Sequence, residues 1–271
     1  TTTVTVTASD GSFDTLCSFT IIVTDQTAPT AICQNIILPL DQNGLASIAT
    51  TDIDFGSSDN CGSIISSLDS TTFSCNDLGD NLVALTITDQ GGLTSTCNAM
   101  VTVVDTLAPQ IFTQDIIVYL DANGQVSITA QDIDAGSTDN CGIESYSIDT
   151  TSFDCSNTGP NQVTLTLTDA SANTSASTTI VTVIDATAPT AICQNITLEL
   201  DASGNAFLAP SDIDSGSSDN CTVSQIALSQ TNFDCSTIGQ NQVVFTITDA
   251  SGNSSSCTAM VTVVNNNVPV A

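Results

Sequence analysis

The residues best suited to chemistry lie in a ten-residue stretch that occurs three times, at an interval of 80 residues. Its copies are DIDFGSSDNC at 52–61, DIDAGSTDNC at 132–141 and DIDSGSSDNC at 212–221. If the stretch ends a strand, Asp52 and Asp54 point the same way and Ile53 points inward, because alternate side chains share a face. Asp59 adds a third carboxylate. Three carboxylates on one loop repel one another unless a cation lies among them, and oxygen ligands favour Ca²⁺. The alternative is that these residues cap turns through their own backbone.

The same reasoning extends to other acidic positions that recur with the repeat. On a sandwich, the acidic loop and the loop that starts at Asp89 lie at one end, where the preceding linker also arrives, and the turn of the preceding repeat is expected to face them. Carboxylates of neighbouring repeats would then meet at each junction, in the manner of cadherin repeats. The alternative is that they are solvated charges that keep the protein soluble. The sequence predicts calcium ligands at Asp25, Asp41, Asp52, Asp54, Asp59, Asp89, Asp105, Asp121, Asp132, Asp134, Asp139, Asp169, Asp185, Asp201, Asp212, Asp214, Asp219 and Asp249.

The charge balance excludes several classes of function. The 271 residues include no Lys, Arg or His against 29 Asp and Glu, so the formal charge is −29 and no side-chain salt bridge can form within the chain. Nucleic acid and anionic membrane surfaces are poor partners, because their phosphates would meet like charge. Most general bases and every Ser-His-Asp arrangement are absent, so we expect no enzyme. A glycosidase built on an Asp pair and an ice-binding Thr-x-Thr face are weaker alternatives.

Eleven cysteines without histidine indicate disulfides rather than zinc ligands. The first and third repeats have four each, whereas the second has Thr113 and Ser177 at two of these positions. The two cysteines of one disulfide are expected to be absent together, because the loss of one alone would leave a free thiol. The two positions without cysteine in the second repeat therefore predict the outer pairs Cys33–Cys97 and Cys193–Cys257 of the other repeats. This leaves inner pairs within each repeat, Cys61–Cys75, Cys141–Cys155 and Cys221–Cys235. Cys17 is then without a partner in these residues and, because it falls 80 positions before Cys97, is expected to pair with a cysteine before residue 1. Such usage indicates an oxidising, extracellular setting.

The 80-residue period predicts tandem domains of one kind. We expect a C-terminal part of a preceding repeat at 1–25, repeats at 26–105, 106–185 and 186–265, and the start of a further repeat at 266–271. Each repeat has short alternating strands and turn signals such as Asp41-Gln42-Asn43-Gly44, with no helical periodicity. The fold class is therefore all-β, an immunoglobulin-like sandwich with parallel first and last strands. No apolar run reaches the roughly 18 residues of a membrane span, so no membrane insertion is expected, and no basic-then-apolar leader opens the chain.

Four motifs carry a resemblance over residues 26–265: DxxAP, LDxxG, DIDxGSxDNC and GxNxVxxTxTD. They resemble the hyalin repeat and related immunoglobulin-like repeats of large secreted bacterial adhesins and surface filaments of the Bacteroidota type. The resemblance implies an extracellular array in adhesion or surface structures, and it supplies no catalytic residue. The second repeat departs from the pattern because it lacks the outer disulfide.

These observations lead to one expected function and one alternative. We expect a calcium-stiffened extracellular array that forms a filament, stalk or surface layer, whose partners are calcium ions and neighbouring repeats, with self-association into fibres. The alternative is the repeat region of an adhesin whose ligand-binding tip is located elsewhere.

Overall fold

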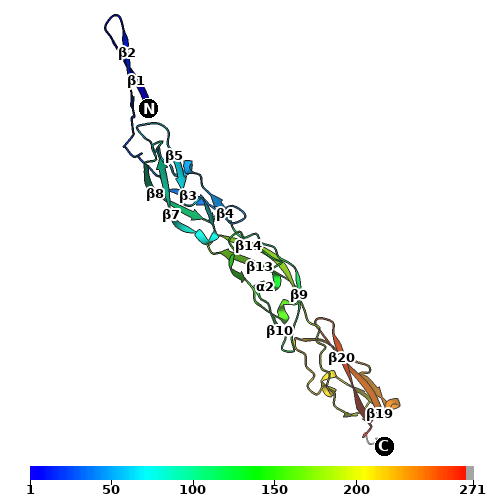
Figure 1. Ribbon diagram of the computed structural model, residues 1–271. Coiled ribbons are helices and arrows are strands. Elements are labelled where there is room, and N and C mark those ends of the chain that lie inside the picture. The colour runs from blue at the N-terminus through cyan, green and yellow to red at the C-terminus, as the bar shows by residue number, and fades with distance from the viewer. Residues whose placement is uncertain (267–271) are drawn as a thin grey trace, which may run out of the picture. The chain divides into compact units, whose positions relative to one another are not determined.

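The computed structural model describes residues 1–266 (Figure 1). The chain is divided into two compact units. The first contains Thr1–Ala108, Asp139–Gly142 and Asp169–Asn173, and the second contains Pro109–Thr138, Ile143–Thr168 and, of the described residues, 174–266. Of the expected further repeat at 266–271, residues 267–271 lie outside the described residues.

The first sandwich is made of two sheets. In chain order its elements are β3 (Ile36–Pro39), β4 (Leu45–Ser47), α1 (Thr50–Ile53), β5 (Ile65–Leu68), β6 (Thr72–Ser74), the 3₁₀ helix η1 (Cys75–Asp77), β7 (Gly79–Thr88) and β8 (Thr94–Val104). The larger sheet has the order β3-β8-β7-β5 and the smaller one pairs β4 with β6. Strands β3 and β8 are parallel, which confirms the predicted pairing of the first and last strands, and the other pairs are antiparallel.

Two further sandwiches repeat this arrangement. The second has β9 (Ile116–Tyr119), β10 (Gln125–Ser127), α2 (Ala130–Ile133), β11 (Ile143–Ile148), β12 (Ser152–Asp154), η2 (Cys155–Asn157), β13 (Gly159–Asp169) and β14 (Thr174–Ile184). The third has β15 (Ile196–Glu199), β16 (Asn205–Phe207), α3 (Pro210–Ile213), β17 (Val223–Leu228), β18 (Asn232–Asp234), η3 (Cys235–Thr237), β19 (Gly239–Asp249) and β20 (Ser254–Val264). The all-β, immunoglobulin-like prediction is confirmed.

Alternation along the two long strands of each sandwich builds its core. Val83, Leu85 and Ile87 of β7 are buried, as are Val101 and Val103 of β8, while the residues between them are more exposed. Because successive side chains of a strand point to opposite faces, this pattern presents one apolar face to the smaller sheet. The same positions of the other two sandwiches are buried in the same way.

A separate hairpin precedes the first sandwich (Figure 1). Strands β1 (Thr2–Ser9) and β2 (Asp14–Ile21) pair antiparallel, with Val6 opposite Cys17, as Leu85 lies opposite Cys97 in β7 and β8. Apolar side chains of the hairpin such as Leu16 and Phe19 are exposed, whereas Leu85 is buried. The hairpin thus has the register of the β7–β8 pair but lacks the strands that cover it there.

Four disulfides join cysteines of residues 1–266. Two of them, Cys33–Cys97 and Cys193–Cys257, are the outer pairs expected from the sequence. In the second sandwich Thr113 and Ser177 occupy the positions of these cysteines, and their hydroxyl oxygens form a hydrogen bond of 3.3 Å.

The predicted inner pairs Cys61–Cys75, Cys141–Cys155 and Cys221–Cys235 are wrong. The structure instead bonds Cys75 to Cys141 and Cys155 to Cys221, so each bond joins one sandwich to the next. The reason is the length of the strand between the predicted partners. Cys75 begins η1, just before the ten-residue strand β7, whereas Cys61 lies near the end of β7, where Asp59 approaches Asp89. A ten-residue strand spans roughly 30 Å, and a disulfide needs Cα atoms within about 7 Å.

The cysteines left unpaired among the described residues are Cys17, as expected, and Cys61 and Cys235. In the described part of the chain, no helix is both long and apolar enough to cross a bilayer.

Candidate metal centre

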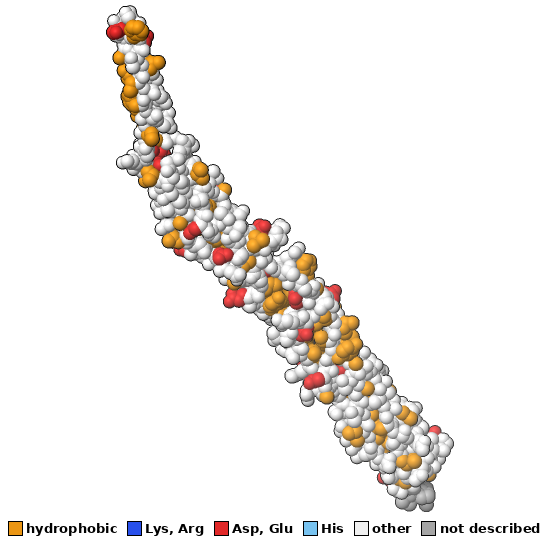
Figure 2. All heavy atoms as spheres, in the orientation of Figure 1, with side chains coloured by type: hydrophobic (Ala, Val, Ile, Leu, Met, Phe, Trp, Pro, Cys, Tyr) orange, Lys and Arg blue, Asp and Glu red, His pale blue; other side chains and the backbone are white. Residues whose placement is uncertain are grey.

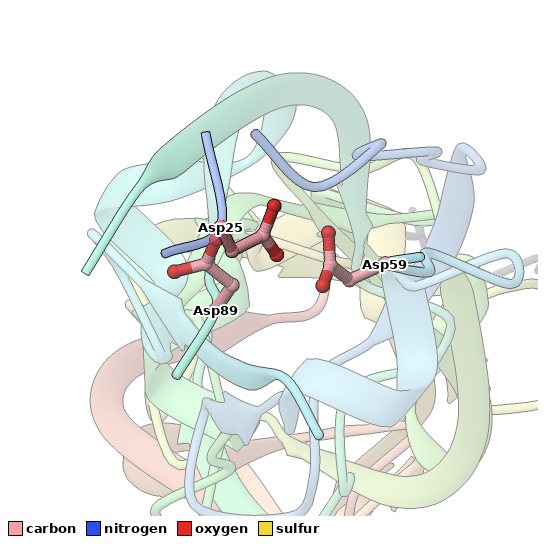
Figure 3. A group of neighbouring side chains, drawn as sticks. All are labelled: Asp25, Asp59 and Asp89. Carbon is pink, nitrogen blue, oxygen red and sulfur yellow. The ribbon is translucent and has the colours of Figure 1, made fainter. Parts of the chain in front are cut away.

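The structure gathers aspartates into three equivalent clusters within residues 1–266. In each cluster one carboxylate oxygen per residue lies within 4.8 Å of the others. The members are Asp25, Asp59 and Asp89; Asp105, Asp139 and Asp169; and Asp185, Asp219 and Asp249. Figure 3 shows the three side chains of the first cluster gathered together. Nine of the eighteen predicted ligands therefore come together, three by three.

Three different backbone elements bring each cluster together. In the second cluster, Asp105 directly follows β8, Asp139 lies in the loop after α2, and Asp169 is the last residue of β13. Each carboxylate is held by backbone groups close to it in the chain. Asp105 Oδ1 accepts from the Leu107 N–H at 3.1 Å, Asp139 Oδ2 from the Cys141 N–H at 2.9 Å, and Asp169 Oδ1 from the Asn173 N–H at 2.8 Å. These local turns hold one oxygen each of Asp105 and Asp139, whereas the second oxygen of Asp169 also accepts from Asn173 Nδ2 at 2.8 Å.

Several oxygen atoms in the clusters are buried and have no hydrogen-bond partner among residues 1–266. In the second cluster they are Asp105 Oδ2 and Asp139 Oδ1, and the third cluster repeats them at Asp185 Oδ2 and Asp219 Oδ1. Asp105 is 6% exposed and Asp185 is 3% exposed. An uncompensated charge at such a position costs several kcal/mol, unless a partner offsets the loss of hydration.

The chain cannot supply a cationic side chain as that partner. It has no Lys, Arg or His, and Figure 2 shows carboxylates without a single basic side chain on this face. The compensating charge must therefore come from outside the chain. The ligand atoms that the clusters gather are carboxylate oxygens, which are the ligand chemistry of a hard divalent cation such as Ca²⁺.

An asparagine beside each of the last two clusters was not among the predicted ligands. The Asn140 side-chain amide donates to Asp105 Oδ1 at 3.1 Å and to the Asp41 carbonyl oxygen at 3.2 Å, while Asn140 Oδ1 is buried and unpartnered within the described chain. Asn220 makes the same two bonds to Asp185 Oδ1 and the Asp121 carbonyl. The asparagine follows the last aspartate of the motif in all three repeats, as Asn60, Asn140 and Asn220, so its recurrence draws attention to the position but does not separate the last two copies from the first.

The other nine predicted ligands lie outside the clusters, and their carboxylates accept hydrogen bonds from backbone N–H groups within four residues of them in the chain. The first set is in the turns after β3, β9 and β15. Asp41 Oδ1 accepts from the N–H groups of Asn43 and Leu45, and these bonds, the Leu45 bond above all, lower the pKa of Asp41. Asp121 and Asp201 form the same turn.

The second and third sets are the two aspartates of the Asp-Ile-Asp motif. The strand end predicted for this motif is wrong, because Asp52 lies in the short helix α1 and Asp54 follows it. Asp52 Oδ2 accepts from the Ala49 N–H, and Asp54 Oδ1 accepts from the Ser57 N–H; bonds from Ser57 lower the pKa of Asp54. Ile53 is fully buried, as expected. The equivalents Asp132, Asp134, Asp212 and Asp214 are bonded in the same way.

The first cluster differs from the other two beside Asp59. Asp25 Oδ2, Asp59 Oδ1 and Asp89 Oδ2 are buried and unpartnered within residues 1–266. However, Asn60 is exposed, and the adjacent Cys61 is unpaired. The first cluster therefore has three carboxylates but lacks the amide oxygen that Asn140 and Asn220 bring to the others.

Comparison with known proteins adds tandem-repeat structures of low similarity. No protein-family model matches the chain, and no curated protein sequence matches it. Similar solved structures include mouse cadherin-23 EC22-24, with 11% identity and a TM-score of 0.35 over 88% of this chain and 99% of that one. Titin domains I67-I69, in an E-to-A mutated variant, have 12% identity and a TM-score of 0.37 over the same shares, 88% and 99%. The protocadherin gamma B4 extracellular domain has 14% identity and a TM-score of 0.32 over 96% of this chain and 54% of that one.

The chain thus spans about half the length of that protocadherin structure. Identities and TM-scores as low as these allow no conclusion about the function of the chain. The strand pairing of the chain itself shows that it is an all-β array of immunoglobulin-like sandwiches.

Proposed function

We propose that the chain is part of an extracellular structural protein whose immunoglobulin-like repeats are stiffened by Ca²⁺. The repeats are 26–105, 106–185 and 186–265, and residues 1–25 and 266–271 belong to neighbouring repeats of the same kind. Each calcium ion binds one acidic cluster. The protein has a mechanical rather than an enzymatic role, as a filament, stalk or surface layer.

One observation carries the proposal: buried carboxylate oxygens such as Asp105 Oδ2 and Asp185 Oδ2 lack a partner among the described residues. A folded chain with an overall charge of −29 gains from any cation that brings such carboxylates together without mutual repulsion. Ca²⁺ fits better than Mg²⁺, because it accepts six to eight oxygen ligands in flexible geometry, whereas Mg²⁺ needs a near-ideal octahedron.

The position of the clusters supports stiffening. Asp105 is the first residue after β8 and leads to Pro109, and proline restricts the backbone at this point without fixing it. An ion bound to Asp105, Asp139 and Asp169 would tie this connecting segment to two loops of the second sandwich. Sandwiches joined only by such a segment move relative to each other by default. Here the Cys75–Cys141 bond already restrains that motion at one point, and the ion would restrain it at a second, on the connecting segment itself.

The disulfides support an extracellular location. Such bonds form and persist in oxidising compartments, and four of them occur in residues 1–266. The resemblance to repeats of bacterial adhesins and surface filaments favours a cell-surface assembly in which arrays associate with one another.

Calorimetry with and without a chelator tests calcium binding. Removal of Ca²⁺ is expected to lower the unfolding temperature, since a ligand that binds only the folded state stabilises it by mass action. Asp169→Asn is expected to reduce this difference, because Asp169 is fully buried in the second cluster. Asp154→Asn is the matched control, as it removes the same charge from an exposed capping residue outside the clusters. An unfolding temperature that does not respond to chelator would refute calcium binding.

Solution scattering tests stiffening separately. The maximum dimension of the chain is expected to fall when Ca²⁺ is removed, and Asp105→Asn is expected to loosen the first connection while each sandwich remains folded. If Ca²⁺ binds but the dimension is unchanged, the ions stabilise individual sandwiches and the mechanical role is wrong.

A further inference from the structure

We propose that the disulfides Cys75–Cys141 and Cys155–Cys221 complete the cation sites, because each holds an asparagine in place as an additional ligand. The ligands are Asn140 Oδ1 in the second cluster and Asn220 Oδ1 in the third. The inference rests on the proposed calcium binding and goes beyond it: the affinity of these two sites depends on a covalent bond to the preceding sandwich.

The covalent geometry ties Asn140 to both partners of the disulfide. Asn140 is flanked by the ligand Asp139 and by Cys141, and its carbonyl oxygen lies 3.3 Å from Cys75 Sγ. The Cys141 N–H donates to Asp139 Oδ2 at 2.9 Å. The bond to Cys75 therefore restrains the backbone on both sides of the Asn140 side chain.

The side chain of Asn140 is then oriented by its own amide group. Its Nδ2 donates to the Asp41 carbonyl of the first sandwich at 3.2 Å and to Asp105 Oδ1 at 3.1 Å. With the nitrogen engaged in this way, Oδ1 is left buried and without a partner among residues 1–266, on a side chain that contacts Asp105 and directly follows Asp139, both of which have an unpartnered oxygen of their own. A neutral amide oxygen in this position adds a ligand without adding repulsion, which suits Ca²⁺.

The third cluster repeats the arrangement independently. Asn220 Nδ2 donates to the Asp121 carbonyl at 3.1 Å and to Asp185 Oδ1 at 3.3 Å, the Asn220 carbonyl lies 3.6 Å from Cys155 Sγ, and Asn220 Oδ1 is buried and unpartnered in the described structure.

The first cluster shows what the site is without the disulfide. Its three carboxylates have the same formal charge as those of the other clusters, but Cys61 is unpaired and Asn60 is exposed. Its buried unpartnered oxygens belong to three carboxylates, whereas in the second cluster they belong to Asp105, Asp139 and the Asn140 amide, because Asn173 Nδ2 donates to Asp169 Oδ2 at 2.8 Å. The structure therefore contains two classes of site, two with a neutral amide ligand and one with carboxylates alone.

Coupling between the disulfide and the ion must act in both directions. If the disulfide strengthens ion binding, then the ion stabilises the disulfide by the same factor. Reduction of these bonds is expected to release calcium, and calcium is expected to protect them from reductant.

Isothermal titration of the intact chain with calcium chloride tests the inference. Two tight sites and one weaker site are expected in the oxidised protein. Asn220→Ala is expected to weaken one tight site by about 10- to 100-fold or more, since loss of its hydrogen bond to the ligand Asp185 alone has an effect of that size and the variant also removes the amide oxygen. Asn60→Ala is the matched control, since it removes the same side chain beside the first cluster and is expected to leave all affinities unchanged.

The double variant Cys155→Ser/Cys221→Ser tests the role of the bond itself. It is expected to convert the same tight site into a weak one, and Cys61→Ser/Cys235→Ser, which removes two unpaired thiols, is expected to have no effect. Circular dichroism checks folding, and Asn220→Ala leaves the bond intact if the double variant unfolds. Three sites of equal affinity, or unaltered binding in Asn220→Ala, would overturn the inference while calcium binding stands. Absence of any calcium binding would overturn both.

Discussion

Thr113 Oγ1 and Ser177 Oγ lie 3.3 Å apart in the second sandwich, at the position where the first and third sandwiches have a disulfide. The surrounding backbone is the same in all three. Thr113 bridges to Asp134 as Cys33 bridges to Asp54, and Ser177 lies opposite Leu165 as Cys97 lies opposite Leu85. A hydrogen bond has replaced a covalent bond without any change in strand register.

Restoring the cysteines should therefore stabilise the second sandwich. We expect Thr113→Cys/Ser177→Cys to form a disulfide, because the equivalent Cα atoms are 5.8 Å and 5.9 Å apart in the other sandwiches. Closing a loop with a sequence separation of 64, as Cys33–Cys97 does, contributes up to about 4 kcal/mol in the chain-entropy model. Calorimetry of the double variant and of each single variant measures the gain. If the bond forms and the unfolding temperature does not rise, cross-linking these two strands does not stabilise the second sandwich, and the prediction is wrong.

The glycine in the turn after β9 should be required for the bond between the second and third sandwiches. Gly124 has φ of +72°, and a Cβ built on it would lie 2.6 Å from Cys155 Sγ and 2.7 Å from the Asn220 carbonyl oxygen. Gly124→Ala is expected to prevent the Cys155–Cys221 bond and to raise the free thiols of the chain from three to five. Thiol titration under denaturing conditions measures this.

Gly204→Ala is the control for Gly124→Ala. Gly204 lies in the equivalent turn with φ of +78°, and its Cβ would approach only the unpaired Cys235. Both variants carry the backbone strain of about 1–2 kcal/mol that a left-handed conformation imposes on alanine. A count of three thiols in both variants would show that the turn tolerates a methyl group beside the disulfide.

Peptide mapping without reduction should recover cross-linked peptides that contain Cys75 with Cys141 and Cys155 with Cys221. Trypsin has no site in a chain without Lys or Arg, so the digestion needs a protease that cleaves at aspartate. Recovery of Cys61 linked to Cys75 would contradict the strand arrangement, because it would require opposite ends of β7 to meet.

Asp149 gives a prediction for the dependence of stability on pH. Its Oδ1 accepts from the Thr164 N–H at 3.0 Å, and this backbone bond lowers the pKa of Asp149. The third sandwich makes the same bond with a neutral residue, since Ser229 Oγ accepts from the Val244 N–H at 2.9 Å. The variant Asp149→Ser therefore keeps a hydrogen bond and removes the titrating group.

A carboxylate whose folded-state pKa is lowered stabilises the protein above its unfolded-state pKa of about 4, and this contribution is lost as the pH falls through the folded-state value. Because Asp149 is exposed, the advantage of the wild type over Asp149→Ser near neutral pH should be below about 1 kcal/mol. It should shrink when urea unfolding is measured in chelator at about pH 3. An equal difference at both pH values would mean that the charge of Asp149 does not matter.

The sequence predicts the sandwich well because its information is local. Alternation places Val83, Leu85 and Ile87 on one face whatever else the chain does, and the period of 80 residues makes each strand visible three times. The pairing of β3 with β8 is also supported, since cysteine is absent at both 113 and 177 in the second repeat, which marks Cys33 and Cys97 as partners beside these two strands.

The acidic sites can be predicted only in part. Asp59 and Asp89 are expected at the same end of the sandwich because their loops follow strands that run toward that end, and the structure brings them together. Asp54 could not be separated from them, since a carboxylate bound by the Ser57 N–H looks like a free ligand in the sequence. Which carboxylates are already satisfied by their own turn depends on backbone angles that the residue types do not determine.

The inner disulfides could not be deduced for a different reason. The same recurring cysteines can pair within a repeat, as Cys61 with Cys75, or between successive repeats, as Cys75 with Cys141. In the sequence the two schemes differ only in which cysteines remain unpaired. Pairing within a repeat leaves fewer single cysteines, and it fails because β7 separates Cys61 from Cys75.

The cross-links also determine how the chain survives a break in its backbone. Cys33–Cys97 and Cys75–Cys141 enclose overlapping stretches, as do Cys155–Cys221 and Cys193–Cys257. A single cut between residues 33 and 141, or between 155 and 257, therefore leaves the two fragments attached to each other. Between Cys141 and Cys155, by contrast, the backbone is the one covalent path through the described structure. This gap exists because Thr113 and Ser177 are not cysteines, so one hydrogen bond in place of a disulfide makes the β11–β12 segment the place between Cys33 and Cys257 where a protease can sever the chain.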